Sequence, residues 1–294
     1  MQWRSIVDRW IGAEPLDDPL SPDPETGLVG AVVVTGGSDG IGFEIAAEFV
    51  DRGHRVVLVA RTEDALHRAV HRLRDRSSKA AVSMIAADIT EEGAGARVVS
   101  SLREDGLVCD VLVNCAGIGS SGLFHKAAPA DLDALLAVNV AALTRLTRDM
   151  LPGMRARKRG GVLNVASFGG LPPGPFQAAY YASKAYVISL SDALAWENRG
   201  TGVRIACVAP GPVETRFHAR MAAETALYRR LLPAMTPRRV ARSAVRGFVS
   251  GRTLIVPGLL FNVVGLGLRL TPRKVQAALT GMLLKPRGPL PNAS

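Results

Sequence analysis

Thr35-Gly36-Gly37-Ser38-Asp39-Gly40-Ile41-Gly42 is the stretch that decides the fold. It ends a short β-branched run, Ala31–Thr35, and leads into Ile41–Arg52, whose apolar residues recur with a helical period. Glycines at positions 36, 40 and 42 allow a tight turn, close approach of a phosphate to main-chain N–H groups, and close packing of helix on strand. A strand, a glycine-rich turn and a helix in this order predict a nucleotide-binding loop.

Strand-like and helix-like segments alternate from this loop to about residue 258. We expect buried strands at Ala31–Thr35, Arg55–Ala60, Ala81–Ala87, Asp110–Asn114, Gly161–Ala166, Val203–Ala209 and Thr253–Val256. We expect helices at Ile41–Arg52, at Thr62–Arg76 with Thr62 as N-cap, and in Ala130–Lys158 and Gln177–Arg199. This alternation is typical of right-handed βαβ units. The predicted fold class is α/β: a doubly wound parallel sheet, that is a Rossmann fold, in a single domain over residues 28–258.

Two segments flank the predicted domain. Residues 1–27 are interpreted as an N-terminal arm or linker, in which Met1–Ile11 has helical spacing. That helix is expected to cap the domain, with an interfacial Trp-bearing helix as the alternative. Residues 259–294 predict a basic, apolar helical tail with helices at Leu259–Leu270 and Pro272–Lys285.

Positive charge is concentrated in the last quarter of the chain. The formal net charge is +10, yet residues 1–215 carry 22 Lys/Arg against 25 Asp/Glu, whereas residues 216–294 carry 14 against one, Glu224. We interpret the tail as packing on its own or a partner subunit; peripheral contact with an anionic membrane and nucleic-acid binding are the alternatives. No module that reads nucleic acid accompanies the charge, so no specific nucleic-acid partner is expected.

Cysteine, histidine and hydropathy patterns bear on compartment and metal content. Cys109, Cys115 and Cys207 lack CxxC spacing and predict reduced structural thiols in a reducing compartment. Histidines do not cluster with cysteines, so no metal site is expected. We see neither an apolar signal-peptide core nor an uninterrupted membrane-spanning stretch. The expected location is cytoplasmic, with peripheral membrane association through the tail kept open.

Tyr180 and Lys184 lie four residues apart in Gln177–Arg199 and therefore share one helix face. An ammonium group near a phenol favours the phenolate and lowers a phenol pKa that is normally ~10. Tyr180 is therefore a candidate general acid/base at neutral pH. The neighbouring Tyr181 is its rival, but no lysine follows Tyr181 at this spacing.

Further motifs occur in a recognisable order. Asn114-Cys115-Ala116-Gly117 follows the fourth strand, Asn139 lies in a helix, Ser167 precedes Tyr180 by thirteen residues, and Pro210-Gly211-Pro212-Val213-Glu214-Thr215 follows the sixth strand. Together with TGxxxGxG and YxxxK, these elements resemble the short-chain dehydrogenase/reductase family over roughly residues 30–258. Its members are single-domain Rossmann enzymes that use NAD(H) or NADP(H).

The resemblance implies a role for each matching residue. Tyr180 would protonate a carbonyl oxygen as hydride arrives, or deprotonate the alcohol in reverse, while Lys184 would lower the pKa of Tyr180 and bind the nicotinamide ribose. Ser167 would donate a hydrogen bond to the oxygen where negative charge develops, and Asn139 would anchor a water linking Lys184 to solvent. The implied cofactor-binding residues are Gly36, Ser38, Asp39, Gly40, Ile41, Gly42, Arg61, Asp88, Ile89, Asn114, Ala116, Gly117, Tyr180, Lys184, Pro210, Gly211, Val213 and Thr215.

The end of the strand Arg55–Ala60 indicates which cofactor is used. An acidic residue there would bind the ribose hydroxyls of NAD, whereas this chain has Ala60 followed by Arg61. A guanidinium suits the 2′-phosphate of NADP, so NADP(H) is expected and NAD(H) is the less favoured alternative. Asp39 departs from the pattern, because many NADP-using relatives carry Arg or Lys in the glycine loop.

Apolar residues flank the expected substrate site. They are Leu123, Phe124, Leu171, Phe176, Phe217 and Leu227, the last two in a lid predicted over Phe217–Pro233. They indicate a lipophilic carbonyl compound or secondary alcohol as the small-molecule substrate. The resemblance implies a homodimer or homotetramer formed through Ala130–Lys158 and Gln177–Arg199. The alternatives are an NAD-dependent enzyme of the same family and a non-catalytic nucleotide-binding or membrane-scaffold protein.

Overall fold

The structure, a computed structural model, describes residues 22–23, 26–77, 79–215, 217, 221, 227 and 233–285. The expected helix Met1–Ile11, most of the arm 1–27 and most of the expected lid Phe217–Pro233 lie outside the described residues.

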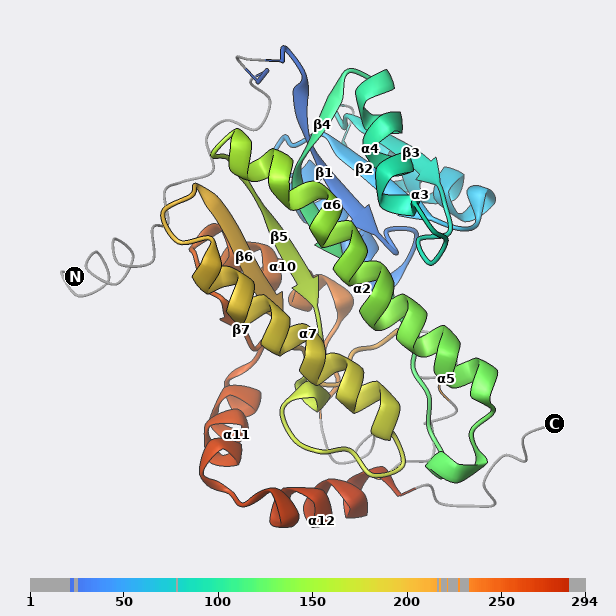
Figure 1. The fold of residues 1–294 in the computed structure, drawn as a ribbon, viewed down its shortest axis with the longest axis vertical. Helices are drawn as coiled ribbons and strands as arrows, with labels where there is room; N and C mark the ends of the chain where they lie inside the picture. Colours follow the sequence, from blue (N-terminus) through green and yellow to red (C-terminus); the bar gives the residue numbers. More distant parts are fainter. Residues whose placement is uncertain are drawn as a thin grey trace.

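Seven strands of the described chain form one sheet, in the order β3-β2-β1-β4-β5-β6-β7, and each neighbouring pair is parallel (Figure 1). The strands are β1 Val29–Thr35, β2 Val56–Ala60, β3 Val82–Ala86, β4 Leu107–Asn114, β5 Gly160–Val165, β6 Val203–Val208 and β7 Leu254–Ile255. The chain reverses its direction of travel across the sheet between β1 and β4, so the loops after these strands diverge and leave a crevice. The predicted doubly wound parallel sheet is confirmed.

Helices cover both faces of the sheet. They are α2 Gly40–Val50, α3 Glu63–Arg76, α4 Ala94–Glu104, α5 Pro129–Leu136, α6 Leu143–Ala156, α7 Ala178–Glu197 and α10 Pro237–Val249. Alternate residues of β1 serve the two layers, as the strand pleat requires. Val32 and Val34 join the core shared with α2, α3 and α10, whereas Ala31 and Val33 join the core shared with α4 and α6.

The helical segment Ala130–Lys158 is not one regular helix. A π-helical turn, Ala137–Ala142, joins α5 to α6, and Asn139 lies within it. Such turns interrupt the regular hydrogen-bond ladder and frequently occur at functional sites. Residue periodicity does not reveal the turn, because the side chains on both sides of it still follow a helical pattern.

Two smaller differences from expectation have local causes. Thr62 is the N-cap residue of α3, as expected, but its side chain makes no capping hydrogen bond. Strand β4 starts at Leu107 rather than at Asp110, because Asp110 occupies a bulge where the pairing with β1 shifts. Asp110 is buried there and accepts a hydrogen bond from Arg159 at 2.6 Å.

The C-terminal tail folds as two helices, α11 Leu259–Leu270 and α12 Arg273–Leu284, which lie beyond the carboxyl ends of the strands (Figure 1). Phe261 anchors α11: its ring meets Phe168 edge to face at 5.1 Å, and a Cβ on Gly211 would lie 2.4 Å from it. Thr280 of α12 donates a hydrogen bond to the carbonyl oxygen of Pro173 at 2.6 Å. The tail therefore packs on its own subunit, and no described helix is long and apolar enough to cross a bilayer.

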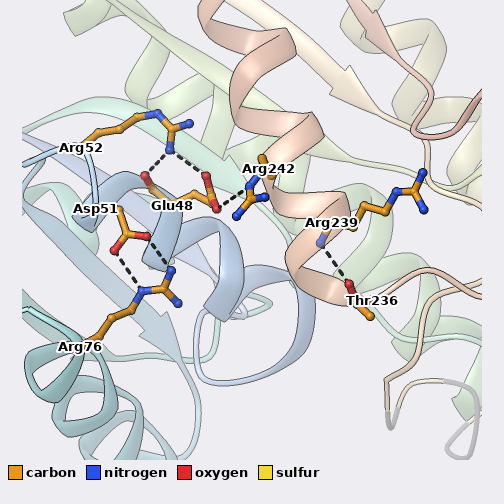
Figure 2. A network of polar contacts seen from close by, with 7 residues as sticks. All are labelled: Glu48, Asp51, Arg52, Arg76, Thr236, Arg239 and Arg242. Atoms are coloured by element: carbon orange, nitrogen blue, oxygen red, sulfur yellow. Dashed lines mark hydrogen bonds and ion pairs between the residues drawn. The ribbon is translucent and has the colours of Figure 1, made fainter.

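A buried carboxylate ties α2 to α10. Glu48 is 5% exposed, and its carboxylate lies 2.9 Å from Arg52, just beyond the end of α2, and 3.6 Å from Arg242 of α10 (Figure 2). A second pair, Asp51 with Arg76 at 2.6 Å, joins the end of α2 to the end of α3. A buried charge held by two guanidinium groups is costly to disturb, because its partners lose their counter-charge.

We predict that Glu48→Gln lowers the free energy of unfolding by about 1.5–3 kcal/mol, the usual range for hydrogen bonds to charged groups. Urea denaturation would measure it. Glu91→Gln is the matched control: its pair with Arg97, at 2.6 Å, is exposed on both sides, and such surface pairs contribute under about 1 kcal/mol. Equal losses in both variants would contradict the prediction.

Candidate active site

The turn after β1 touches the loop after β4, and the glycines make this contact possible. A Cβ on Gly36, which has φ of +65°, would lie 2.9 Å from the main chain of Ala116, and a Cβ on Gly42 would lie 2.4 Å from the carbonyl oxygen of Gly36. The hydroxyl oxygen of Thr35 accepts hydrogen bonds from the N–H groups of Cys115 and Ala116, at 3.1 and 3.2 Å. Sequence reasoning did not single out Thr35 as the side chain that fixes this contact.

A cavity of about 260 Å³ opens over this contact. Four stretches of chain meet in it: the glycine loop, the loop after β4, the end of β5 with α7, and the loop after β6. The residues predicted from sequence that line it are Gly36, Ser38, Asp39, Gly40, Ile41, Gly42, Ala116, Gly117, Ser167, Tyr180, Lys184, Pro210, Gly211, Val213 and Thr215. The glycine-rich turn at the N-terminus of α2 fits an anionic pyrophosphate, as a dinucleotide requires.

Tyr180 and Lys184 lie one turn apart on α7, and both are buried. The Lys184 Nζ donates a hydrogen bond to the carbonyl oxygen of Val165 at 3.0 Å and lies 5.8 Å from the centroid of the Tyr180 ring. Burial lowers the pKa of the Lys184 ammonium group. The lysine amino group is thus buried beside the phenol.

Tyr181 does not line this cavity, but it lines a smaller pocket beside Tyr180. Its ring packs on the loop between β5 and α7, where a Cβ on Gly174 would lie 2.2 Å from it and a Cβ on Gly169 would lie 2.8 Å from it. Tyr180, unlike Tyr181, lines the cavity above the glycine loop. The arrangement favours Tyr180 over its neighbour as the group that meets a bound cofactor.

Asn139 organises the floor of the site from its π-helical turn. Its Oδ1 accepts from the N–H of Ile118 at 2.9 Å, and its Nδ2 donates to the carbonyl oxygen of Ile118 at 2.8 Å and to Ser183 at 3.1 Å. Ser183 in turn donates to the carbonyl oxygen of Tyr180 at 2.7 Å. The amide therefore connects the loop after β4 to the helix turn that carries Tyr180.

Ser167 and Asn114 occupy different environments. Ser167 lines the cavity, and its hydroxyl oxygen accepts a hydrogen bond from the N–H of Gly169 at 3.1 Å, which leaves its own proton to be donated. Asn114 lies inside the sheet at 3% exposure and donates to Thr147 at 3.1 Å and to Asn164 at 2.9 Å. Its side chain links β4, β5 and α6 beneath the site rather than facing the cavity.

A second cavity, of about 670 Å³, extends from the glycine loop along α3. Three of the candidate cofactor residues, Arg61, Asp88 and Ile89, line it, and Arg61 lies 3.9 Å from Asp88. Hydrogen bonds from Thr90, with a smaller contribution from the Arg61 charge, lower the pKa of the Asp88 carboxyl. Asp39 also lines this cavity; it is the N-cap residue of α2, but its side chain makes no capping hydrogen bond.

Two arginines that the sequence reasoning missed line this second cavity. Arg68 and Arg72 lie four residues apart on α3, on the same side as Ala65, and join Arg61 around the hollow. The guanidinium of Arg72 also lies 3.9 Å from the centroid of the Phe43 ring. The i, i+3 and i+7 spacing of residues 65, 68 and 72 was the available signal, because it places them on one helix face.

A third pocket, of about 120 Å³ and largely apolar, adjoins Ser167 and Tyr180. Three of its walls come from the loop between β5 and α7, from Met221 and from the C-terminal tail. The tail residues are Phe261, Thr280, Leu283 and Leu284. Sequence reasoning did not place the tail at the site, because nothing in residues 259–285 shows which loop they meet.

The cysteines fit the interpretation as structural thiols. All three are free, and burial raises the pKa of Cys115 and of Cys207 to about 12, so both stay protonated at neutral pH. Among the described residues, no three His, Cys, Asp or Glu side chains are grouped so that they could hold a metal ion.

The glycine cradle, the parallel sheet and the crevice define a dinucleotide-binding α/β protein. The family model described as short chain dehydrogenase matches residues 30–226. The chain belongs to the short-chain dehydrogenase/reductase family, which consists of NAD(P)-dependent oxidoreductases.

Relatives of several kinds resemble this chain. It is 38% identical over 190 residues to a short chain dehydrogenase of Pseudocercospora fijiensis, and 36% identical over 189 residues to a very-long-chain 3-oxoacyl-CoA reductase of Bos taurus. These matches cover 64% and 63% of this chain but only 60% of either relative. The solved short-chain dehydrogenase from Sphingobium yanoikuyae in complex with NADPH is 31% identical with a TM-score of 0.71, covering 85% of this chain and 98% of that one.

We predict that Lys184→Met stabilises the protein at pH 7 and raises Tm by about 2–4 °C, the shift expected per kcal/mol for a chain of this size. Because the folded-state pKa of Lys184 lies below its unfolded-state value, the unfolded chain binds more protons between the two, and wild-type stability rises with pH across that window. The advantage of the variant should therefore shrink as pH approaches 10.5, the ordinary lysine value. Thermal unfolding followed by circular dichroism at several pH values tests this.

Lys126→Met, at an exposed lysine, is the control and should leave Tm unchanged. A lower Tm for Lys184→Met than for the wild type would show that the bond to Val165 outweighs the cost of burying the charge.

Proposed function

We propose that this protein is an NADP(H)-dependent oxidoreductase that transfers hydride between nicotinamide and a carbonyl or secondary-alcohol carbon of a lipophilic substrate. The observation that carries the proposal is that Ser167, Tyr180 and Lys184 line the same cavity as the glycine loop. Hydride chemistry is supplied by the bound nicotinamide; the protein supplies binding, orientation and a proton.

In this mechanism Tyr180 is the general acid in the reducing direction and gives its hydroxyl proton to the carbonyl oxygen. Ser167 donates a hydrogen bond to the same oxygen as negative charge develops on it. Lys184 stabilises the tyrosinate that remains, because its charge is buried and therefore weakly screened. Asn139 acts as a positioning residue through Ser183 and the Tyr180 carbonyl group, and its predicted role in anchoring a water belongs to this proposal.

The preference for NADP(H) rests on charge around the second cavity. Arg61, Arg68 and Arg72 line it, so a phosphate on the adenosine ribose would meet three guanidinium groups. Binding of NADPH by the 31% identical relative supports the same choice. Asp88 and Asp39 are the acidic groups of the same hollow, and they would disfavour a phosphate placed directly beside them.

The substrate class rests on the pocket beside Ser167 and Tyr180. Met221, Phe261, Leu283 and Leu284 give it apolar walls, which suit an aliphatic or alicyclic group next to the reacting carbon. The very-long-chain reductase among the relatives acts, by its name, on an acyl chain of this character. Of the loop residues expected from sequence, Phe217 lines the cofactor cavity, and Phe176 packs with Leu284.

A homodimer or homotetramer in the cytoplasm belongs to the same proposal. The helices expected to form its interface, α5 to α7, leave Leu136, Tyr186 and Trp196 exposed. The alternative hypothesis, a non-catalytic nucleotide-binding protein, does not explain why Lys184 is buried beside Tyr180.

We predict that Tyr180→Phe lowers kcat for NADPH-dependent ketone reduction by about 10²–10⁴-fold, the usual contribution of a general acid, while the Kd for NADPH stays nearly unchanged. Tyr181→Phe is the matched control and should keep most of the activity. Stopped-flow absorbance at the nicotinamide band, with nicotinamide fluorescence for binding, separates the two quantities. Wild-type turnover in Tyr180→Phe would refute the catalytic assignment.

We predict that Arg61→Ala raises the Kd for NADPH by about 10–100-fold, because a charged hydrogen bond contributes about 1.5–3 kcal/mol, and leaves the Kd for NADH nearly unchanged. Titration followed by nicotinamide fluorescence gives both constants. Arg103→Ala, an exposed arginine on α4 at the opposite face, controls for the loss of net charge. Equal weakening for both nucleotides would argue for an NAD-dependent enzyme.

A further inference from the structure

The outer faces of α11 and α12 carry most of the exposed large hydrophobic side chains of the described chain. Nine of its fourteen exposed large hydrophobic side chains lie on these two helices. They are Leu259, Leu260, Val263, Val264, Leu266, Leu270, Val275, Leu279 and Met282. Exposed side chains of this size are ordinary when scattered, but a gathering on consecutive elements marks an interaction surface.

The exposed residues form stripes rather than a random scatter. Leu259, Val263, Leu266 and Leu270 recur at helical spacing along α11, and their exposure ranges from 62% to 86%. The opposite side of the helix packs against the domain. Phe261 is buried there, and a Cβ on Gly265 would lie 3.5 Å from the side chains of Phe168 and Leu171. One face of the helix is thus used within the subunit and the other is presented outward.

Basic side chains border the stripes. Arg269, Lys274 and Lys285 are exposed beside them, Arg273 is exposed at the start of α12, and the sequence from residue 225 to the end contains no acidic residue. Lys274 and Lys285, the C-cap residue of α12, are eleven residues apart, three helical turns, so they lie along the same edge of the helix. An apolar stripe flanked by positive charge complements the boundary between acyl chains and anionic headgroups.

A second copy of the chain fits this surface less well. A two-fold interface sets a surface patch against its own copy, which would bring these four cations toward their equivalents with no acid on the two helices to compensate. Anionic lipid has no such conflict. The charge of the patch therefore selects the bilayer as its occupant.

The inner side of the same helices faces the apolar pocket. Leu283 and Leu284 of α12, and Phe261 of α11, line it beside Ser167 and Tyr180. The distance from an outward side chain to an inward one is the width of a single helix, on the order of 10 Å. A substrate at the outer face of α11 or α12 would therefore need to pass only one helix to reach the pocket.

We propose that α11 and α12 bind the surface of an anionic bilayer and that the pocket behind them takes a long aliphatic ketone or alcohol from that bilayer. The binding surface stands on its own observations; the supply of substrate rests on the proposed function. The protein lies on the membrane rather than crossing it, in keeping with the lack of a spanning helix among the described residues.

Flotation of the full chain with lipid vesicles tests the surface. The wild type should float with phosphatidylcholine vesicles that contain phosphatidylglycerol and much less with phosphatidylcholine alone. Val263→Asp with Leu266→Asp should reduce partitioning by at least about tenfold, since two exposed apolar side chains leave the lipid. Val249→Asp, at an exposed valine on α10, is the matched control and should float like the wild type. Lys274→Gln with Lys285→Gln should remove most of the preference for anionic vesicles.

Three results would overturn the surface proposal: no flotation of the wild type, equal loss in Val249→Asp, or conversion of a wild-type oligomer to a monomer by the double aspartate variant in light scattering. The last result would assign the face to a second copy.

Turnover tests the supply of substrate. With NADPH, the double aspartate variant should reduce a short soluble ketone at the wild-type rate but lose about tenfold toward a long-chain ketone dissolved in the anionic vesicles. If the double aspartate variant reduced both ketones at the wild-type rates, the proposed supply of substrate from the membrane would be refuted. If the wild type reduces neither ketone but still floats with anionic vesicles, the proposed function is refuted and the proposed membrane-binding surface stands.

Discussion

The contact between the turn after β1 and the loop after β4 is the constraint on which the rest of the site depends. A methyl group on Gly36 or Gly42 would collide with main-chain atoms, so the contact exists only without those side chains. Gly36, Ser38, Asp39, Ala116 and Gly117 line both large cavities, which makes this contact the shared floor of the two hollows. Thr35 holds it through the same hydroxyl that also reaches the carbonyl oxygen of Val113. Without it, the halves of the crevice would not form one continuous groove.

Placement of charge at the site works against stability. Lys184 is an ammonium group at 6% exposure, with one hydrogen bond to a main-chain carbonyl oxygen in the described structure. Asn139, Ser183 and Asn164 are buried polar side chains nearby, but their hydrogen bonds are met by neighbouring groups. The polar interior therefore fixes the geometry, while the lysine carries the energetic cost that its chemistry requires.

Local patterns predicted most of the sheet and the glycine turn at its carboxyl edge, because strand alternation and glycine spacing are set by neighbours in sequence. Most of the other candidate residues at that edge came from the family resemblance. What the local patterns missed depends on contacts between distant segments. Asp110 looked like the start of a strand because its bulge and its bond to Arg159 are tertiary. Arg68 and Arg72 belong to the helix predicted over Thr62–Arg76, and nothing near them in the sequence shows that they line a cavity with the loop after β1. Asn114 matches a cofactor motif, yet its side-chain Nδ2 donates its hydrogen bonds to Thr147 and Asn164 inside the sheet. The family-derived roles of the site residues remain proposals.

The tail is gripped by the loops it covers: Phe261 lies on Gly211 and Phe168, and Thr280 is bonded to Pro173. Each tail helix therefore has two faces that can take part in binding: the inner face contacts a ligand in the pocket, and the outer face contacts an external partner. Thermodynamic reciprocity then applies: if occupancy of one side changes affinity at the other, the reverse change is equal in size. In that case the protein with an occupied pocket would bind its outer partner with a different affinity from the protein with an empty pocket, so that substrate binding and product release would change how firmly the outer partner is bound.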